Sequence, residues 1–257
     1  MAGAALATAA LSLAGPLQAQ TANGYPNHPV VMLVPTAAGG TTDIAARMLG
    51  VPLGTALGQT IVVDNKGGAN GAIAAVAVKR AEPDGYTLLM QYSGSHVITP
   101  LVSKQTQQWQ ASDLTPVANV LSAPQIVVIR ADLPIKTMAE LVAYAKAHPG
   151  KLRVLATTGK TRLPSLPDVP TTAEAGLPKL DATSWFAVFA PARTPKPIID
   201  KLSSEIAKVV ATPAFKQKAL EQGAVADYQS PQQMADAVKL ESARWAEVVK
   251  ATGIEAD

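Results

Sequence analysis

Short apolar runs alternate with stretches of helical periodicity from Val30 onward. The runs 30–34, 61–63 and 86–90 are predicted strands, and 43–57 and 69–81 are predicted helices. This order is typical of parallel strands joined by crossover helices. The pattern therefore predicts an α/β fold.

The second half of the chain continues the alternation with more interruptions. Strands are expected at 117–121 and 126–129, and Ser122-Ala123-Pro124 between them is predicted to carry the chain from one lobe to another. A helix is expected at 136–147. Further on, the pattern predicts an extended loop with three prolines and then a Thr171/Glu174 capping box that opens a short helix. A strand is expected at 184–189, and helices are expected to begin after Thr194-Pro195 and Ser230-Pro231.

Composition removes several classes of function. The 257 residues carry 22 basic and 19 acidic side chains, scattered without the basic clusters that a phosphate backbone requires, so nucleic-acid binding is not expected. Cysteine is absent, which excludes disulfides, thiolate metal sites and thiol nucleophiles. His28, His96 and His148 stand alone without paired ligand spacing, so no metal is expected, and no motif indicates a cofactor.

The first twenty residues predict an exported protein. Residues 4–14 form an apolar run of small residues, and Leu17-Gln18-Ala19 offers a signal-peptidase site, so 1–20 is interpreted as a signal peptide. The basic residues that usually precede such a run are missing, since Arg47 is the first Lys or Arg. A disordered Ala-rich tail is the alternative interpretation.

The candidate site with the clearest physical basis follows the first strand. Its residues run from Pro35 through Thr36, Ala37, Ala38, Gly39, Gly40, Thr41 and Thr42 to Asp43. A glycine-rich turn that opens a helix leaves N–H groups unpaired at the positive end of the helix dipole, where an anion fits. The spacing matches neither a Walker loop nor a dinucleotide fingerprint. An ordinary tight turn, with Asp43 favouring the first helical turn, is the alternative.

A second candidate, Ser93-Gly94-Ser95-His96, follows the third strand and is expected at the same carboxyl edge of the sheet. Its hydroxyls and amides could complete a polar site. A hydrolase that uses Ser93 or Ser95 with His96 is an alternative hypothesis, although the nucleophile-elbow pattern is missing. A polar loop with capping hydroxyls is the structural alternative.

Several segments together resemble the periplasmic receptors of tripartite tricarboxylate transporters, the Bug family. They occur in the family's order over almost the whole chain: Tyr25-Pro26, Val34-Pro35, 39–43, 64–71, 83–89, 93–96, 163–176, 184–186 and 190–197. The resemblance implies a periplasmic binding protein of the type II-like fold, with two lobes that close on a small organic acid and no catalysis. It implies Pro35, Thr36, Gly39, Gly40, Thr41, Asp43, Ser93, Gly94, Ser95 and His96 as ligand residues.

The chain departs from the family pattern after Leu152. Family members continue there into a strand, a ligand loop, a helix and further segments, whereas Arg153 here begins what resembles a later strand. An internal deletion and an incomplete second lobe are therefore expected. The predicted division is 1–20 signal peptide, 21–122 plus 228–257 lobe 1, and 123–227 reduced lobe 2.

The resemblance also implies partners. We expect a small carboxylate ligand, a membrane permease, and a monomer unless the deletion exposes apolar surface. Weakened binding is expected, because the lost loop would have supplied ligand contacts. A periplasmic sensor or interaction subunit without a transport role is the remaining alternative.

Overall fold

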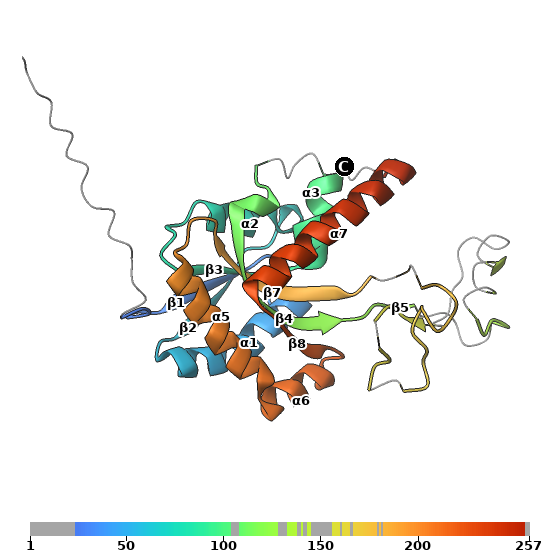
Figure 1. Ribbon diagram of the computed structural model, residues 1–257, viewed down its shortest axis with the longest axis horizontal. Coiled ribbons are helices and arrows are strands. Elements are labelled where there is room, and N and C mark those ends of the chain that lie inside the picture. The colour runs from blue at the N-terminus through green and yellow to red at the C-terminus, as the bar shows by residue number, and fades with distance from the viewer. Residues whose placement is uncertain are drawn as a thin grey trace, which may run out of the picture.

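A six-stranded sheet forms the body of the protein, seen in the computed structural model in Figure 1. The structure describes residues 24–103, 108–127, 133–137, 140, 143–144, 156–159, 161–164, 167–178, 180 and 182–254. The predicted signal peptide and most of the helix expected at 136–147 lie outside these residues. None of the helices within the described ranges is long and apolar enough to cross a membrane.

The strand order in the main sheet is β2-β1-β3-β7-β4-β8. The strands are β1 (Val30–Val34), β2 (Ile61–Asn65), β3 (Thr87–Tyr92), β4 (Leu114–Ala123), β7 (Ser184–Pro191) and β8 (Val225–Gln229). β1 pairs in parallel with β2 and β3, whereas β7 runs antiparallel to β3 and β4. The carboxyl ends of β1 to β4 therefore lie at one edge, which confirms the α/β prediction.

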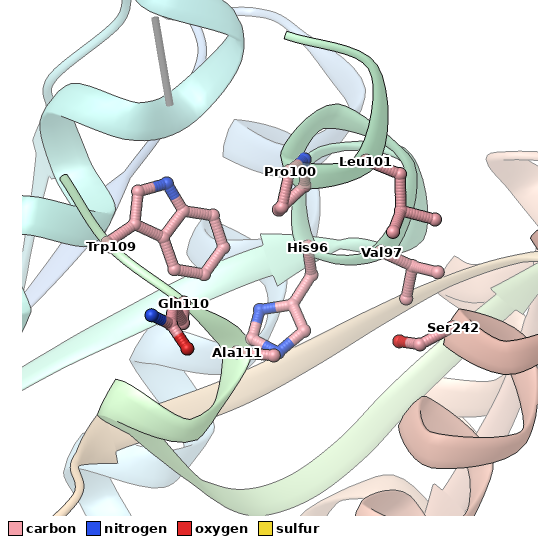
Figure 2. Close-up of a pocket in the computed structure, with 8 residues that line it drawn as sticks. All are labelled: His96, Val97, Pro100, Leu101, Trp109, Gln110, Ala111 and Ser242. Carbon is pink, nitrogen blue, oxygen red and sulfur yellow. The ribbon is translucent and has the colours of Figure 1, made fainter. Parts of the chain in front are cut away.

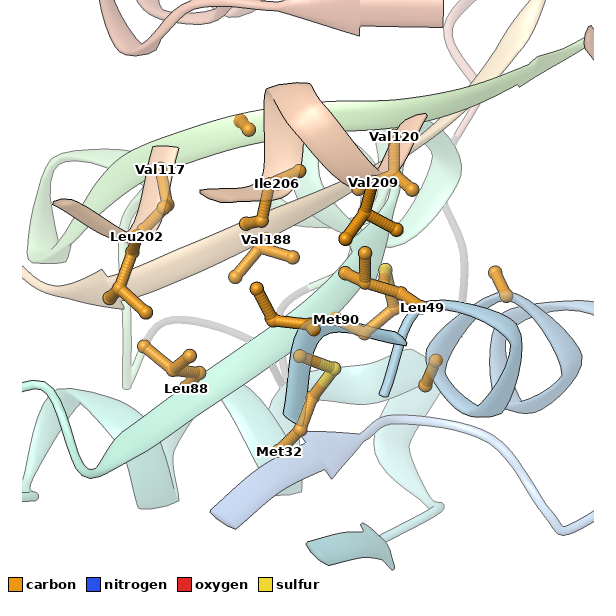
Figure 3. Packing of buried hydrophobic residues seen from close by; sticks show 14 of the residues in the cluster. Met32, Leu49, Leu88, Met90, Val117, Val120, Val188, Leu202, Ile206 and Val209 are labelled. Carbon is orange, nitrogen blue, oxygen red and sulfur yellow. The ribbon is translucent and has the colours of Figure 1, made fainter. Parts of the chain in front are cut away.

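Helices cover both faces of this sheet. They are α1 (Thr41–Leu57), α2 (Ala72–Lys79), α3 (Thr99–Val102), α5 (Lys196–Ala211), α6 (Pro213–Glu221) and α7 (Pro231–Thr252), with short helical segments at Ala69–Gly71 (η1), Gly94–Ile98 (η2) and Ala111–Asp113 (η4). Residues of α1, α5 and α6 pack with Met32, Leu88 and Met90 on one face (Figure 3). Residues of α2 and α7 pack on the other face.

Local signals explain where the main helices begin and end. α7 begins after Ser230, as Ser230-Pro231 predicts, and a capping box forms there: the Ser230 Oγ accepts from the Gln233 amide, and the Gln233 side chain accepts from the Ser230 amide. α1 ends at Gly58, which takes φ +71°. The Thr194 hydroxyl, in contrast, has no hydrogen-bond partner among the described residues, so the cap expected there is not formed.

The structure corrects the predicted boundary between the lobes. Residues 184–227 were assigned to lobe 2, but β7 pairs between β3 and β4, and α5, α6 and β8 pack with the same sheet. The second lobe is reduced to the part between β4 and β7, where β5 (Ile126–Val127) and β6 (Ala156–Thr157) pair antiparallel. Figure 1 shows β4 and β7 leading from the body toward this part.

The described second lobe has a small core. Leu133, Ile135 and Ala156 are its buried apolar residues, with Tyr144, Ala175 and Leu177 packed against them. The predicted Thr171/Glu174 capping box is formed, at 2.7 Å from the Thr171 amide to the Glu174 carboxylate and 3.2 Å from the Glu174 amide to the Thr171 hydroxyl. A turn follows it instead of the expected helix.

Candidate functional site

The junction between β1 and α1 presents unpaired backbone donors. Gly40 is the N-cap of α1 and provides no side chain to accept from the helix. In the described part of the chain, the amides of Thr41, Thr42 and Asp43 have no hydrogen-bond acceptor. These N–H groups stand at the positive end of a helix of 17 residues, which makes the junction suitable for an anion.

The glycine amides of the loop are not part of this donor set. The Gly39 amide donates to the Asp43 Oδ2 at 2.9 Å, and the Gly40 amide donates to the Ala37 carbonyl at 3.1 Å. The unpaired donors expected where the glycine-rich turn opens the helix are therefore not the amides of Gly39 and Gly40 themselves. The glycines form the tight turn, and the free donors lie in the first turn of the helix.

Asp43 organises the loop. Its side chain is 2% exposed and accepts hydrogen bonds from the Gly39 amide, the Arg47 Nε at 2.9 Å and the Asn65 Nδ2 at 3.0 Å. Burial by itself would raise the pKa of Asp43, but these hydrogen bonds outweigh it and hold the pKa below its usual value. The Asp43 carboxylate therefore supports the loop, while the Asp43 backbone amide belongs to the unpaired donors.

A third loop, which the sequence did not single out as a ligand loop, joins the site. The Asn65 Nδ2 donates to the Thr36 carbonyl at 3.0 Å, and Gly67 lies against the backbone of Thr36 and Ala37. Gly71 lies between Pro35 and Ser95. The loops after β1, β2 and β3 therefore meet at the carboxyl edge of the sheet, as α/β binding sites do.

Replacing Gly71 by alanine is expected to lower the free energy of unfolding by about 2–3 kcal/mol. Gly71 has φ +92°, and an added Cβ would lie 2.1 Å from the Ser95 Oγ and 3.1 Å from the Pro35 Cβ. Gly58→Ala is the matched control, since Gly58 has φ +71° with nothing within 4 Å of the added atom. Urea unfolding measures both. Equal losses would contradict the close approach of the loops.

The Ser93–His96 segment is helical rather than an open loop. Gly94–Ile98 forms a single π-helical turn, η2. The Ser95 hydroxyl donates to the Asn70 carbonyl at 2.7 Å, and this bond holds η2 against η1. Ser93 precedes the turn and is nearly buried. Of the predicted residues, Ser95 thus lies close to Pro35, across Gly71.

His96 does not face that loop. It is 1% exposed, and its ring stacks on Phe189 with centroids 4.1 Å apart. It lines a cavity of about 310 Å³ with Trp109 and Pro100 (Figure 2), to which residues 35–43 contribute nothing. Burial lowers the pKa of His96 to about 3, so its ring is neutral. The prediction of His96 as a ligand residue at the loops is corrected for this reason.

The same geometry bears on catalysis and metals. Within the described residues no hydrogen bond joins His96 to Ser93 or Ser95, and the Ser95 hydroxyl is already used by Asn70. Nothing in the site favours the hydrolase alternative. Over the described ranges, no three His, Asp or Glu side chains gather into a possible metal site.

Polar loops at the carboxyl edge of one α/β lobe, and two strands leading into another lobe, define the class of periplasmic solute-binding proteins. The chain belongs to the tripartite tricarboxylate transporter receptor family. It matches the family described as "Tripartite tricarboxylate transporter family receptor" over residues 45–154 and 149–254. This match confirms the family inferred from the sequence motifs.

Relatives and solved structures agree with this assignment. A UPF0065 protein of Bordetella bronchiseptica is 32% identical, covering 85% of this chain and 83% of its own, and BugT of Bordetella pertussis is 30% identical, covering 95% and 94%. Rpa4515 of R. palustris, with adipate, has TM-score 0.78 and 28% identity, covering 90% and 99%. MatC of Rhodopseudomonas palustris, with bound malate, has TM-score 0.76 and 25% identity, covering 88% and 100%.

The comparisons also confirm an incomplete second lobe. The B. bronchiseptica alignment has 282 positions, and 85% of 257 residues is about 218, so about 64 positions have no counterpart here. The BugT alignment has 311 positions, and 95% of 257 residues is about 244, so about 67 positions have no counterpart here. The two family matches overlap at residues 149–154, which agrees with a deletion close to Leu152.

Proposed function

We propose that this chain is a periplasmic receptor that binds a small di- or tricarboxylate through the first-turn amides of α1. The carrying observation is the unpaired set of N–H groups at Thr41, Thr42 and Asp43 at the meeting point of three loops. Each charge-assisted hydrogen bond to such a donor contributes about 1.5–3 kcal/mol. The adipate and malate bound by solved relatives support the same class of ligand.

The cations near the loop do not compete for this role. Residues 35–43 and 93–96 contain no Lys or Arg, and Arg47 is paired with Asp43 at 2.9 Å. The hydroxyl of Thr36 is buried and has no hydrogen-bond partner in the described structure, so it is a further candidate contact. We propose Pro35, Thr36, Thr41, Ser93, Gly94 and Ser95 as the lining of the ligand site, with Asp43 and the two glycines as its support.

The reduced second lobe sets the expected affinity. A ligand loop on that lobe would supply two or three hydrogen bonds, and their loss weakens binding by several powers of ten. We therefore expect dissociation constants in the range of about 0.1–10 mM. Export by the N-terminal segment, delivery to a membrane permease, and a monomeric state complete the proposal.

Thr41→Pro tests the amide site. Thr41 is the first helical residue, where proline is well tolerated, and Gly40 has φ −71° and ψ 160°, as a residue before proline requires. The variant therefore removes one donor and keeps the helix. In calorimetric titrations with adipate, malate and citrate, we expect it to raise Kd about 10- to 100-fold.

Thr41→Ala is the matched control, because it removes the side chain and keeps the amide. We expect its Kd to stay within about threefold of the original. No heat from any of the three acids at 20 mM, or equal affinity in the two variants, would overturn the amide site.

A further inference from the structure

A second cavity lies on the flank of the body that α7 covers. Its volume is about 600 Å³, and its walls come from α7, β4, β7 and β8 together with residues 161–163 of the second lobe. That volume is within the range of small-molecule sites. Residues 35–43 and 93–96 do not line it, so it is distinct from the amide site.

The cavity has an apolar wall. Trp185 is 5% exposed, and its indole Nε1 donates to the Glu241 Oε2 at 3.0 Å, which fixes the ring. Leu240 on α7 lines the same cavity and is 73% exposed, so most of its side chain contacts no protein. An apolar body placed between Trp185 and Leu240 would be removed from water, which is favourable in proportion to the area covered.

One cation in the lining has unused donors. Arg162 is paired with Glu174 at 2.9 Å. Arg244, in contrast, has neither an ion pair nor a hydrogen bond within the described residues. The Arg244 guanidinium lies 5.4 Å from the centre of the Trp245 ring. A guanidinium presents five donors in a fork that matches a carboxylate.

Two carboxylates limit the charge that the cavity accepts. The Asp227 carboxylate accepts from the Ser122 Oγ at 2.5 Å and the Asn119 Nδ2 at 3.1 Å, and Glu241 holds Trp185. Both line the cavity with Arg244. A ligand with one negative group pairs with Arg244, while a second negative group would meet like charges.

We propose that this cavity binds an amphipathic monocarboxylate, with its carboxylate on Arg244 and its hydrocarbon body against Trp185 and Leu240. Arylalkanoates such as 3-phenylpropionate have the required shape and charge. The amide site selects for negative groups at a helix terminus, whereas this cavity selects for one negative group on an apolar body. The chain would thus carry two sites with different ligand classes.

The test is a titration of the full chain with 3-phenylpropionate, followed by tryptophan fluorescence and calorimetry. Arg244→Met keeps the aliphatic stem and removes the charge, and we expect Kd to rise about 10- to 100-fold. Lys239→Met, an exposed change on the same helix outside the cavity, should stay within about twofold. Leu240→Ser should weaken binding about 3- to 10-fold through the apolar wall.

Two further arms separate this cavity from the amide site. Hexanoate, a monocarboxylate, should bind more tightly than adipate, the dicarboxylate with the same number of carbon atoms. Thr41→Pro should leave the affinity for 3-phenylpropionate unchanged. The proposal is overturned by the absence of saturable binding up to 20 mM, by equal affinity in Arg244→Met, or by loss of binding in Thr41→Pro. That last result would place the probe at the amide site and leave the receptor proposal intact.

Discussion

Asp43→Ala is expected to lower the free energy of unfolding by about 2–4 kcal/mol and to abolish measurable carboxylate binding. The Asp43 side chain is buried, and its loss leaves the Gly39 amide without an acceptor and the Asn65 Nδ2 with only the Thr36 carbonyl. The turn that aims the first-turn amides of α1 then loses its anchor. Urea unfolding and calorimetric titration with adipate measure the two effects.

Variants at the same cluster separate positioning from charge. Arg47 is the outer partner of Asp43, and the Arg47 side chain is 54% exposed. Arg47→Met should therefore lower the free energy of unfolding by less than about 1 kcal/mol. Asp43→Asn keeps one acceptor oxygen, so its loss of stability should lie between those of Asp43→Ala and Arg47→Met. If Asp43→Ala were no less stable than Arg47→Met, Asp43 would not hold the loop.

The sequence predicts local elements well because their signals are local. The apolar run at 30–34 and the glycine-rich turn before Asp43 place β1 and α1 correctly, and Ser230-Pro231 marks the start of α7. These features depend on neighbours within a few residues along the chain. The same signals place the proposed site at the carboxyl edge of the sheet.

The errors arise from contacts between distant residues. The antiparallel pairing of β7 between β3 and β4 moves residues 184–227 into the first lobe, and no local periodicity specifies it. The reversal of Asp43 toward Gly39 depends on Asn65, which lies 22 residues further along the chain. Whether an individual amide is free is decided by such partners, so the sequence alone does not show that the Gly39 and Gly40 amides are occupied.

The incomplete second lobe changes the role of the first lobe in capture. A binding protein with two full lobes gains affinity when both contact the ligand and exclude water. The proposed amide site lies within one lobe, since the loops after β1, β2 and β3 all follow strands of the six-stranded sheet. We therefore expect the amides of the first lobe to keep their preference for negatively charged ligands, even though the protein binds them weakly.

Acid is expected to destabilise the protein well above the pH at which carboxylates are protonated. The pKa of His96 is lowered by burial to about 3, whereas an unfolded histidine has a pKa near 6.5. Between these values the unfolded chain binds a proton that the folded chain does not, so stability falls as the pH falls. From pH 7.5 to pH 5 the loss is about 2 kcal/mol.

The surroundings of His96 leave this penalty uncompensated. Phe189, Trp185 and Trp109 are its ring neighbours, and none of the residues lining its cavity is charged. The carboxylates with lowered pKa values, among them Asp43 and Glu174, contribute mainly below about pH 5, where their unfolded forms take up protons. In the window from pH 7.5 to pH 5, His96 therefore dominates the expected slope among the groups with shifted pKa values.

His96→Phe should remove most of this acid sensitivity. A phenyl ring preserves the stacking on Phe189, the cavity of about 310 Å³ gives room for its extra volume, and no group remains to be protonated. Urea unfolding at pH 5, 6 and 7.5 measures the slope, and the same slope in His96→Phe as in the original chain would show that another group causes it.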